Sequence, residues 1–111
     1  MEKGPSEYAE FWTSEFNEVS HIKRHSKHMK FKNPYDYSKA AKEFALNQDP
    51  NILSFKSMQG ATYKYNPDTN EFIIISRYGK IVTYFPPDRG IDYYYDQFEK
   101  FGNKNRSEDY E

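Results

Sequence analysis

The chain of 111 residues contains no cysteine, which excludes disulfide bonds and metal sites built on thiolates. Long hydrophobic runs are also absent. No segment approaches the ~20 apolar residues that span a bilayer, and the first residues lack the pattern of a signal peptide. We therefore expect one soluble domain with no membrane-embedded part, which could also stand inside a longer protein.

A large net charge is absent as well: it is −1 at pH 7, which argues against a generally basic nucleic-acid binder. The charges are nevertheless unevenly distributed. Residues 1–20 carry five Glu and one Lys, whereas residues 21–42 carry seven Lys or Arg and a single acidic residue, Asp36. Basic charge focused on one segment suits a phosphate-binding site, and a solvated helix face has the same composition.

Aromatic residues are abundant, at 19% of the chain, and most of them are expected to fill a small core. Hydrophobic periodicity predicts a helix over residues 6–19 and a second one over residues 36–46, with Asp36 as its cap. Four short runs rich in β-branched and aromatic residues follow between residues 52 and 85, joined by short turns. The expected fold class is α+β, with N-terminal helices packed on a four-stranded antiparallel sheet. Residues 91–101 would form a closing helix or an ordered coil.

The last predicted hairpin can be interpreted residue by residue. A two-residue turn at positions 78–79 predicts that Ile74 pairs with Thr83. Because side chains alternate between the two faces of a sheet, one face would be almost entirely apolar and the other partly polar. The face expected against the helices carries Ile73, Ile75, Val82 and Tyr84. The face that could form the floor of a cleft carries Phe72, Ile74, Ser76, Ile81, Thr83 and Phe85.

All three histidines lie in the segment HIKRHSKHMKF, residues 21–31. If this segment is helical, His21, Arg24, His25 and His28 share one face. Histidines at i and i+4 can share a metal ion, but Arg24 and the lysines nearby would repel a cation, and no carboxylate completes a site. Alternatively, the segment is a solvated basic helix without chemistry. The third interpretation is RNA cleavage.

Cutting a ribose phosphodiester without a metal ion requires a base for the 2′-hydroxyl, an acid for the leaving 5′-oxygen, and charge stabilisation of the phosphorane. Histidine suits both proton transfers because its unperturbed pKa of ~6.5 leaves both forms available near neutrality. Arginine and lysine suit the phosphate. The basic segment next to a strand that bears a hydroxyl group would supply all these parts.

Two stretches, HIKRHSKHMKFKNPYDYSKAAKEF and YKYNPDTNEFIIISRYGKIVTYFPPDRGIDYY, resemble in this order a family of C-terminal RNase toxin domains. These domains end bacterial polymorphic toxins, including contact-dependent growth-inhibition effectors, and are grouped with colicin D, barnase, EndoU and RelE-like nucleases. The resemblance covers residues 21–94. It implies a barnase/RelE-like fold and a metal-independent endoribonuclease, without a cofactor, that cleaves tRNA and leaves a 2′,3′-cyclic phosphate.

The resemblance also implies roles for individual residues. The family signature of a basic residue followed by histidine matches Arg24-His25, the hydroxyl of the last strand matches Thr83, and the aromatic residue two positions on matches Phe85. The candidate catalytic residues are His25, Arg24, Thr83, His21 and His28, where the last two compete for the second proton transfer. The candidate substrate-binding residues are Lys27, Lys30, Phe85 and Tyr94. No residue is expected to bind a metal ion.

On this interpretation residues 1–20 are a helical extension or the end of a linker, residues 21–102 are the nuclease domain, and residues 103–111 are a frayed tail. The resemblance implies export from the producing bacterium within a larger toxin, action in the cytoplasm of the target cell, and a cognate immunity protein. The basic excess of residues 21–42 predicts that this inhibitor is acidic. A host translation factor as a further partner stays open. The alternative is a noncatalytic RNA- or protein-binding module of the same fold.

Overall fold

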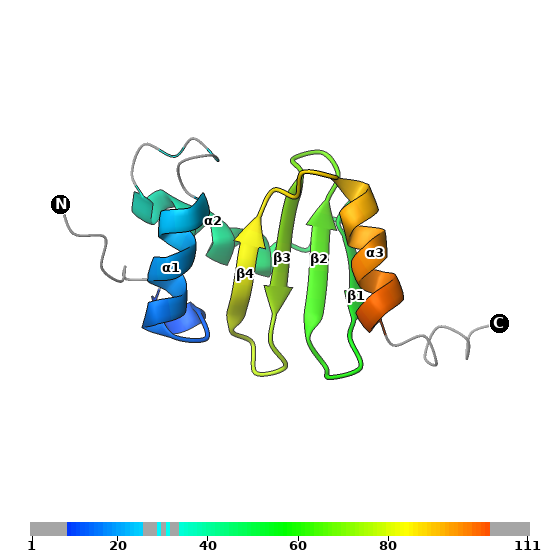
Figure 1. Cartoon of the computed structure of the whole chain (residues 1–111), viewed down its shortest axis with the longest axis horizontal. Coiled ribbons are helices and arrows are strands. Elements are labelled where there is room, and N and C mark those ends of the chain that lie inside the picture. The colour runs from blue at the N-terminus through cyan, green and yellow to red at the C-terminus, as the bar shows by residue number, and fades with distance from the viewer. Residues whose placement is uncertain (1–8, 26–28, 30, 32–33, 103–111) are drawn as a thin grey trace.

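The computed structural model of the chain describes residues 9–25, 29, 31 and 34–102 (Figure 1). The elements in chain order are η1 (Ala9–Phe11), α1 (Glu15–His25), α2 (Pro34–Leu46), β1 (Leu53–Lys56), β2 (Thr62–Asn66), β3 (Glu71–Ile75), β4 (Ile81–Phe85) and α3 (Ile91–Phe101). The strands pair in the order β1-β2-β3-β4, and every pair is antiparallel. The predicted α+β class with a four-stranded antiparallel sheet is confirmed.

Helices cover both faces of the sheet. On one face, Tyr37 of α2 packs against Tyr84 of β4, with ring centroids 5.3 Å apart. On the opposite face, Tyr94 of α3 stacks on Tyr65 of β2 at 6.0 Å. α1 lies beside β4, at the edge of the sheet, and packs against α2 (Figure 1). The sheet therefore separates two hydrophobic clusters, and residues 91–101 form the closing helix α3 rather than an ordered coil.

The first predicted helix, over residues 6–19, is interrupted in the structure. η1 ends at Phe11, and Trp12 then forms a parallel bridge with Ile81 at the start of β4. A separate helix, α1, begins after this bridge. The Ser14 hydroxyl caps its first turn by accepting a hydrogen bond of 2.9 Å from the main-chain N–H of Asn17. Pairing with the open edge of β4 replaces the helical hydrogen bonds that this segment would otherwise make.

The predicted start of the second helix is also wrong. The sequence predicts a helix over residues 36–46 with Asp36 as its cap, but α2 begins at Pro34. Proline suits the first helical turn because the N–H group that it lacks would have no partner inside the helix. Asp36 accordingly lies within the first turn, where its negative charge is favourable to the helix dipole.

The β3–β4 connection is one residue longer than predicted. The main-chain N–H of Ser76 donates to the carbonyl of Lys80 at 2.7 Å, and the N–H of Gly79 donates to the carbonyl of Ser76 at 2.9 Å. The loop therefore consists of residues 77–79, a type of hairpin that ends in a residue with positive φ. Gly79 takes that position with φ of 83°.

A β-bulge next to the loop restores the predicted pairing further along the hairpin. Ile75 pairs with Ile81, whereas Ile74 pairs with Thr83, so Val82 is the additional residue. The predicted pairing of Ile74 with Thr83 is confirmed. The predicted face of Ile81 is wrong, because the bulge turns this side chain into the core beneath the N-terminal helices, where it is buried beside Trp12.

Candidate active site

The turns of α1 bring two histidines against the side chains of β4. His21 and His25 are one helical turn apart, and their rings stack with centroids 5.5 Å apart. His21 Nδ1 lies 3.4 Å from Thr83 Oγ1, a contact whose donor depends on the imidazole tautomer. The His25 ring stacks on Phe85 at 5.3 Å with an interplanar angle of 18°. Four of the sequence-predicted site residues thus form one cluster, which we call the histidine cluster.

Burial controls the protonation of His21. Its side chain is only 9% exposed, and its ring stacks on Trp12 with centroids 5.5 Å apart. Loss of solvation, and secondarily the positive charge of Arg24, lower the pKa of His21 to about 4. At neutral pH the imidazole of His21 is therefore uncharged, and it can accept or donate a hydrogen bond without carrying charge.

This lowered pKa predicts that the free energy of unfolding depends on pH. Between pH 6.5 and 4 the unfolded chain binds a proton at His21 while the folded chain does not. The contribution of His21 to the free energy of unfolding is therefore complete above pH 6.5 and is lost as the pH falls through this window. We expect a loss of roughly 1–2 kcal/mol after allowing for solvent screening. Urea denaturation of the wild type and of His21→Gln at both pH values measures it, since the glutamine variant retains the response of every other group. Equal pH dependence in the two proteins would contradict the prediction.

Arg24 lies on α1 between the two histidines in sequence and is exposed. Its charge contributes to the lowered pKa of His21. Burial raises the pKa of Tyr37, whose ring is 6.3 Å from that of His25, and the charge of Arg24 opposes this rise. The guanidinium is thus close enough to the histidine cluster to act on its electrostatics while staying accessible to a ligand. His28, Lys27 and Lys30 lie outside the described residues.

Phe85 is packed on several sides. One side faces His25, while the rings of Phe72 and Tyr93 meet it edge-on at 5.5 and 5.6 Å. Phe85 therefore holds the plane of the His25 ring.

Tyr94 does not join the histidine cluster. Its ring is buried against Tyr65 in the second hydrophobic cluster, and burial raises its pKa to about 12. Successive residues of a helix point about 100° apart, so the neighbouring Tyr93 is the one that reaches Phe85. Sequence periodicity alone could not choose among the three consecutive tyrosines.

A buried polar network behind the site was missed by sequence reasoning. The indole N–H of Trp12 donates to the Ser38 hydroxyl at 2.9 Å, and this hydroxyl donates to the carboxylate of Glu18. Glu18 is fully buried and precedes His21 by one turn of α1. Residues 1–20 contain five glutamates, and composition alone does not indicate which of them is buried. The signal available was the spacing of Glu18 and His21, which places them on one side of a helix.

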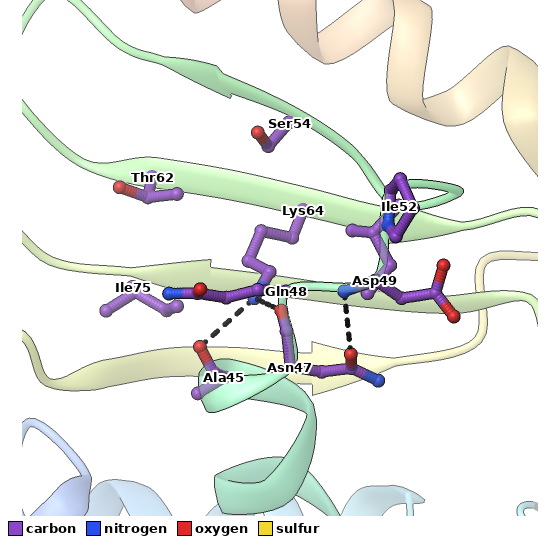
Figure 2. A pocket seen from close by; sticks show the side chains of 10 residues that line it. Ala45, Asn47, Gln48, Asp49, Ile52, Ser54, Thr62, Lys64 and Ile75 are labelled. Carbon is purple, nitrogen blue, oxygen red and sulfur yellow. Dashed lines mark hydrogen bonds between the residues drawn. The ribbon is translucent and has the colours of Figure 1, made fainter.

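A cavity in the described part of the chain lies elsewhere, between the end of α2 and the sheet (Figure 2). It measures about 500 Å³, and Lys64 of β2 reaches across it to the main-chain carbonyls of Ala45 and Asn47, at 3.1 and 2.6 Å. Burial lowers the pKa of Lys64. Its ammonium also donates to the main-chain carbonyl of Phe44, so three carbonyls accept hydrogen bonds from it. Lys64 therefore terminates α2 by binding its last carbonyls, and none of the predicted site residues lines this cavity.

Within the described ranges, no group of three or more His, Cys, Asp or Glu side chains is arranged to hold a metal ion. Nor does any helix there have the length and apolar character needed to cross a membrane. In comparisons with known proteins, no family model and no curated protein matches the chain. The grounds for a function are therefore the geometry of the histidine cluster and the resemblance of two sequence stretches to RNase toxin domains.

Proposed function

We propose that this chain is a metal-independent endoribonuclease domain of a bacterial toxin, which cleaves tRNA through attack of a 2′-hydroxyl. The observation that supports the proposal is the histidine cluster itself. It brings two imidazoles and a strand hydroxyl together from α1 and β4, although His21 and Thr83 are 62 positions apart. The exposed cation of Arg24 lies beside them on α1 and acts on His21. These are the groups that cleavage of a ribose phosphodiester requires.

The electrostatics of the cluster suggest a division of roles. His25 transfers a proton, and the guanidinium of Arg24 stabilises the charge of the phosphorane. His21 stays neutral at pH 7 because its pKa is about 4, so it is a positioning residue that orients the Thr83 hydroxyl through the 3.4 Å contact. His28 is then the candidate for the second proton transfer.

The test is to incubate the purified domain with total tRNA in the presence of EDTA. We expect discrete fragments that end in a 2′,3′-cyclic phosphate, because the 2′-hydroxyl is the nucleophile and no metal ion takes part. RNA that is bound but stays intact would instead indicate the alternative, a noncatalytic RNA-binding module. Fragments that form only without EDTA would restore the metal-dependent interpretation.

The proposal includes a partner and a place of action. A toxin domain of this kind needs a cognate immunity protein in the cell that makes it, and reaches the cytoplasm of the target cell after export within a larger protein. Lys23 and Arg24 are both exposed on α1, so an inhibitor that covers the histidine cluster would present acidic side chains there. Opposite charges would speed association and make its rate fall as salt rises.

Removing the Thr83 hydroxyl tests its contribution. Thr83→Val keeps the shape of the side chain and loses one hydrogen-bonding group, so we expect a roughly 3- to 10-fold lower kcat/KM for tRNA cleavage. Thr83→Ser, which retains the hydroxyl, should cleave at close to the wild-type rate. As a matched control, Thr69→Val changes an exposed threonine in the turn between β2 and β3, outside the cluster. Wild-type kcat/KM in Thr83→Val would remove this residue from the site.

A further inference from the structure

Two turns meet at one end of the sheet and expose large side chains there. A Cβ placed on Gly60, in the β1–β2 turn, would lie 3.2 Å from the Cβ of Arg77, in the β3–β4 loop. Tyr78 at the tip of this loop is 74% exposed, and Met58 in the other turn is 64% exposed. Exposed side chains of this size need an explanation when they gather on adjoining turns.

The charges on these two turns are all positive. Lys56, Arg77 and Lys80 are exposed, and neither residues 56–62 nor residues 76–81 contain an acidic side chain. Where Lys80 meets the segment before α1, its ammonium donates to the main-chain carbonyl of Glu10. We use the name turn surface for the exposed cations and large apolar or aromatic side chains of the two turns: Lys56, Met58, Arg77, Tyr78 and Lys80.

The Tyr78 ring is held in place by its neighbour. The Arg77 guanidinium lies 5.0 Å from the ring centroid, and its Nη2 donates to the Tyr78 hydroxyl at 2.8 Å. One side of the ring is thus covered by a cation, while the rest is open to solvent. An aromatic ring flanked by cations is a surface on which an unpaired base can stack while its phosphates are neutralised.

We infer that the turn surface is a second contact for RNA. It binds unpaired nucleotides of the same RNA molecule that lie outside the histidine cluster. The inference rests on the proposed function for the identity of the ligand. β4 joins the two places, since Lys80 directly precedes the strand and Phe85 ends it. Four steps of ~3.3 Å along the strand separate Ile81 from Phe85, so only an RNA longer than a dinucleotide can reach both.

Binding can be measured without relying on cleavage. The probe is a short, fluorescently labelled, single-stranded 2′-O-methyl RNA, which lacks the nucleophilic hydroxyl and stays intact. In fluorescence anisotropy with the full chain, we expect Tyr78→Ala to raise Kd roughly 5- to 100-fold. This is the effect of replacing one aromatic side chain that stacks on a base in other proteins. Arg77→Ala and Lys80→Ala should each raise Kd and reduce the slope of log K against log salt by about 0.7 for each phosphate that is no longer neutralised.

Tyr95→Ala is the matched control, because Tyr95 is an exposed tyrosine on α3, and it should bind the probe as the wild type does. Circular dichroism verifies that all variants are folded. An unchanged Kd in Tyr78→Ala, or an equal weakening in Tyr95→Ala, would overturn the inference and leave the turn surface as a candidate docking site for a protein. A chain that leaves tRNA intact but shows the Tyr78 effect would overturn the proposed ribonuclease activity and not the second RNA-binding surface.

Discussion

Replacing His25 by alanine is expected to lower the rate of tRNA cleavage by ~10²–10⁴-fold while the domain stays folded. His25 is the residue of the histidine cluster assigned to proton transfer, and alanine cannot take its place in the transition state. The stacking of its ring on His21 and on Phe85 contributes only about 0.5–1.5 kcal/mol each to stability. Initial rates on tRNA, together with thermal unfolding of the same preparations, measure both effects.

A second variant separates chemistry from packing. His25→Phe retains an aromatic ring that can stack on Phe85 but has no group that transfers a proton. We expect it to be as inactive as the alanine variant and nearly as stable as the wild type. If His25→Phe cleaved tRNA at the wild-type rate, His25 would be a packing residue and the assigned role would be wrong.

Replacing Trp12 by alanine is expected to lower the free energy of unfolding by about 3–5 kcal/mol, which is a large part of the ~5–15 kcal/mol that stabilises a typical domain. Trp12 is 2% exposed, packs among the residues of α1, α2 and β4, and stacks on His21. Its removal leaves a cavity at the point where the N-terminal segment joins the edge of the sheet. Urea denaturation followed by circular dichroism measures the destabilisation.

Trp12→Phe is the companion variant. It keeps most of the buried apolar surface and loses the indole N–H that donates to Ser38, so we expect a smaller destabilisation of about 1–3 kcal/mol. Because Ser38 still donates to Glu18, its hydroxyl keeps one partner. A destabilisation below about 1 kcal/mol in Trp12→Ala would show that α1 is held against β4 by other interactions.

Local patterns in the sequence determined much of the fold. Runs of β-branched and aromatic residues predicted the four strands, because such side chains fit a pleated, half-buried surface. The expected turn at residues 78–79 predicted the pairing of Ile74 with Thr83, which the bulge preserves although the loop is one residue longer. Alternation along the strand then predicted the shared face of Thr83 and Phe85. Spacing on a helix likewise placed His21, Arg24 and His25 together, since residues three and four apart share a side of the helix.

Long-range packing decided the rest. Periodicity carries no information on which edge of the sheet a helix will adjoin, and only that placement puts His21 beside Thr83. The lowered pKa of His21 follows from burial, which is a property of the assembled core and not of residue type. The inward turn of Ile81 depends on a bulge that compensates for a longer loop, and the interruption at Trp12 depends on the open edge of β4. In each case an interaction between distant segments overrode a local preference, because burying a large apolar side chain or pairing a strand edge yields more free energy than one turn of helix.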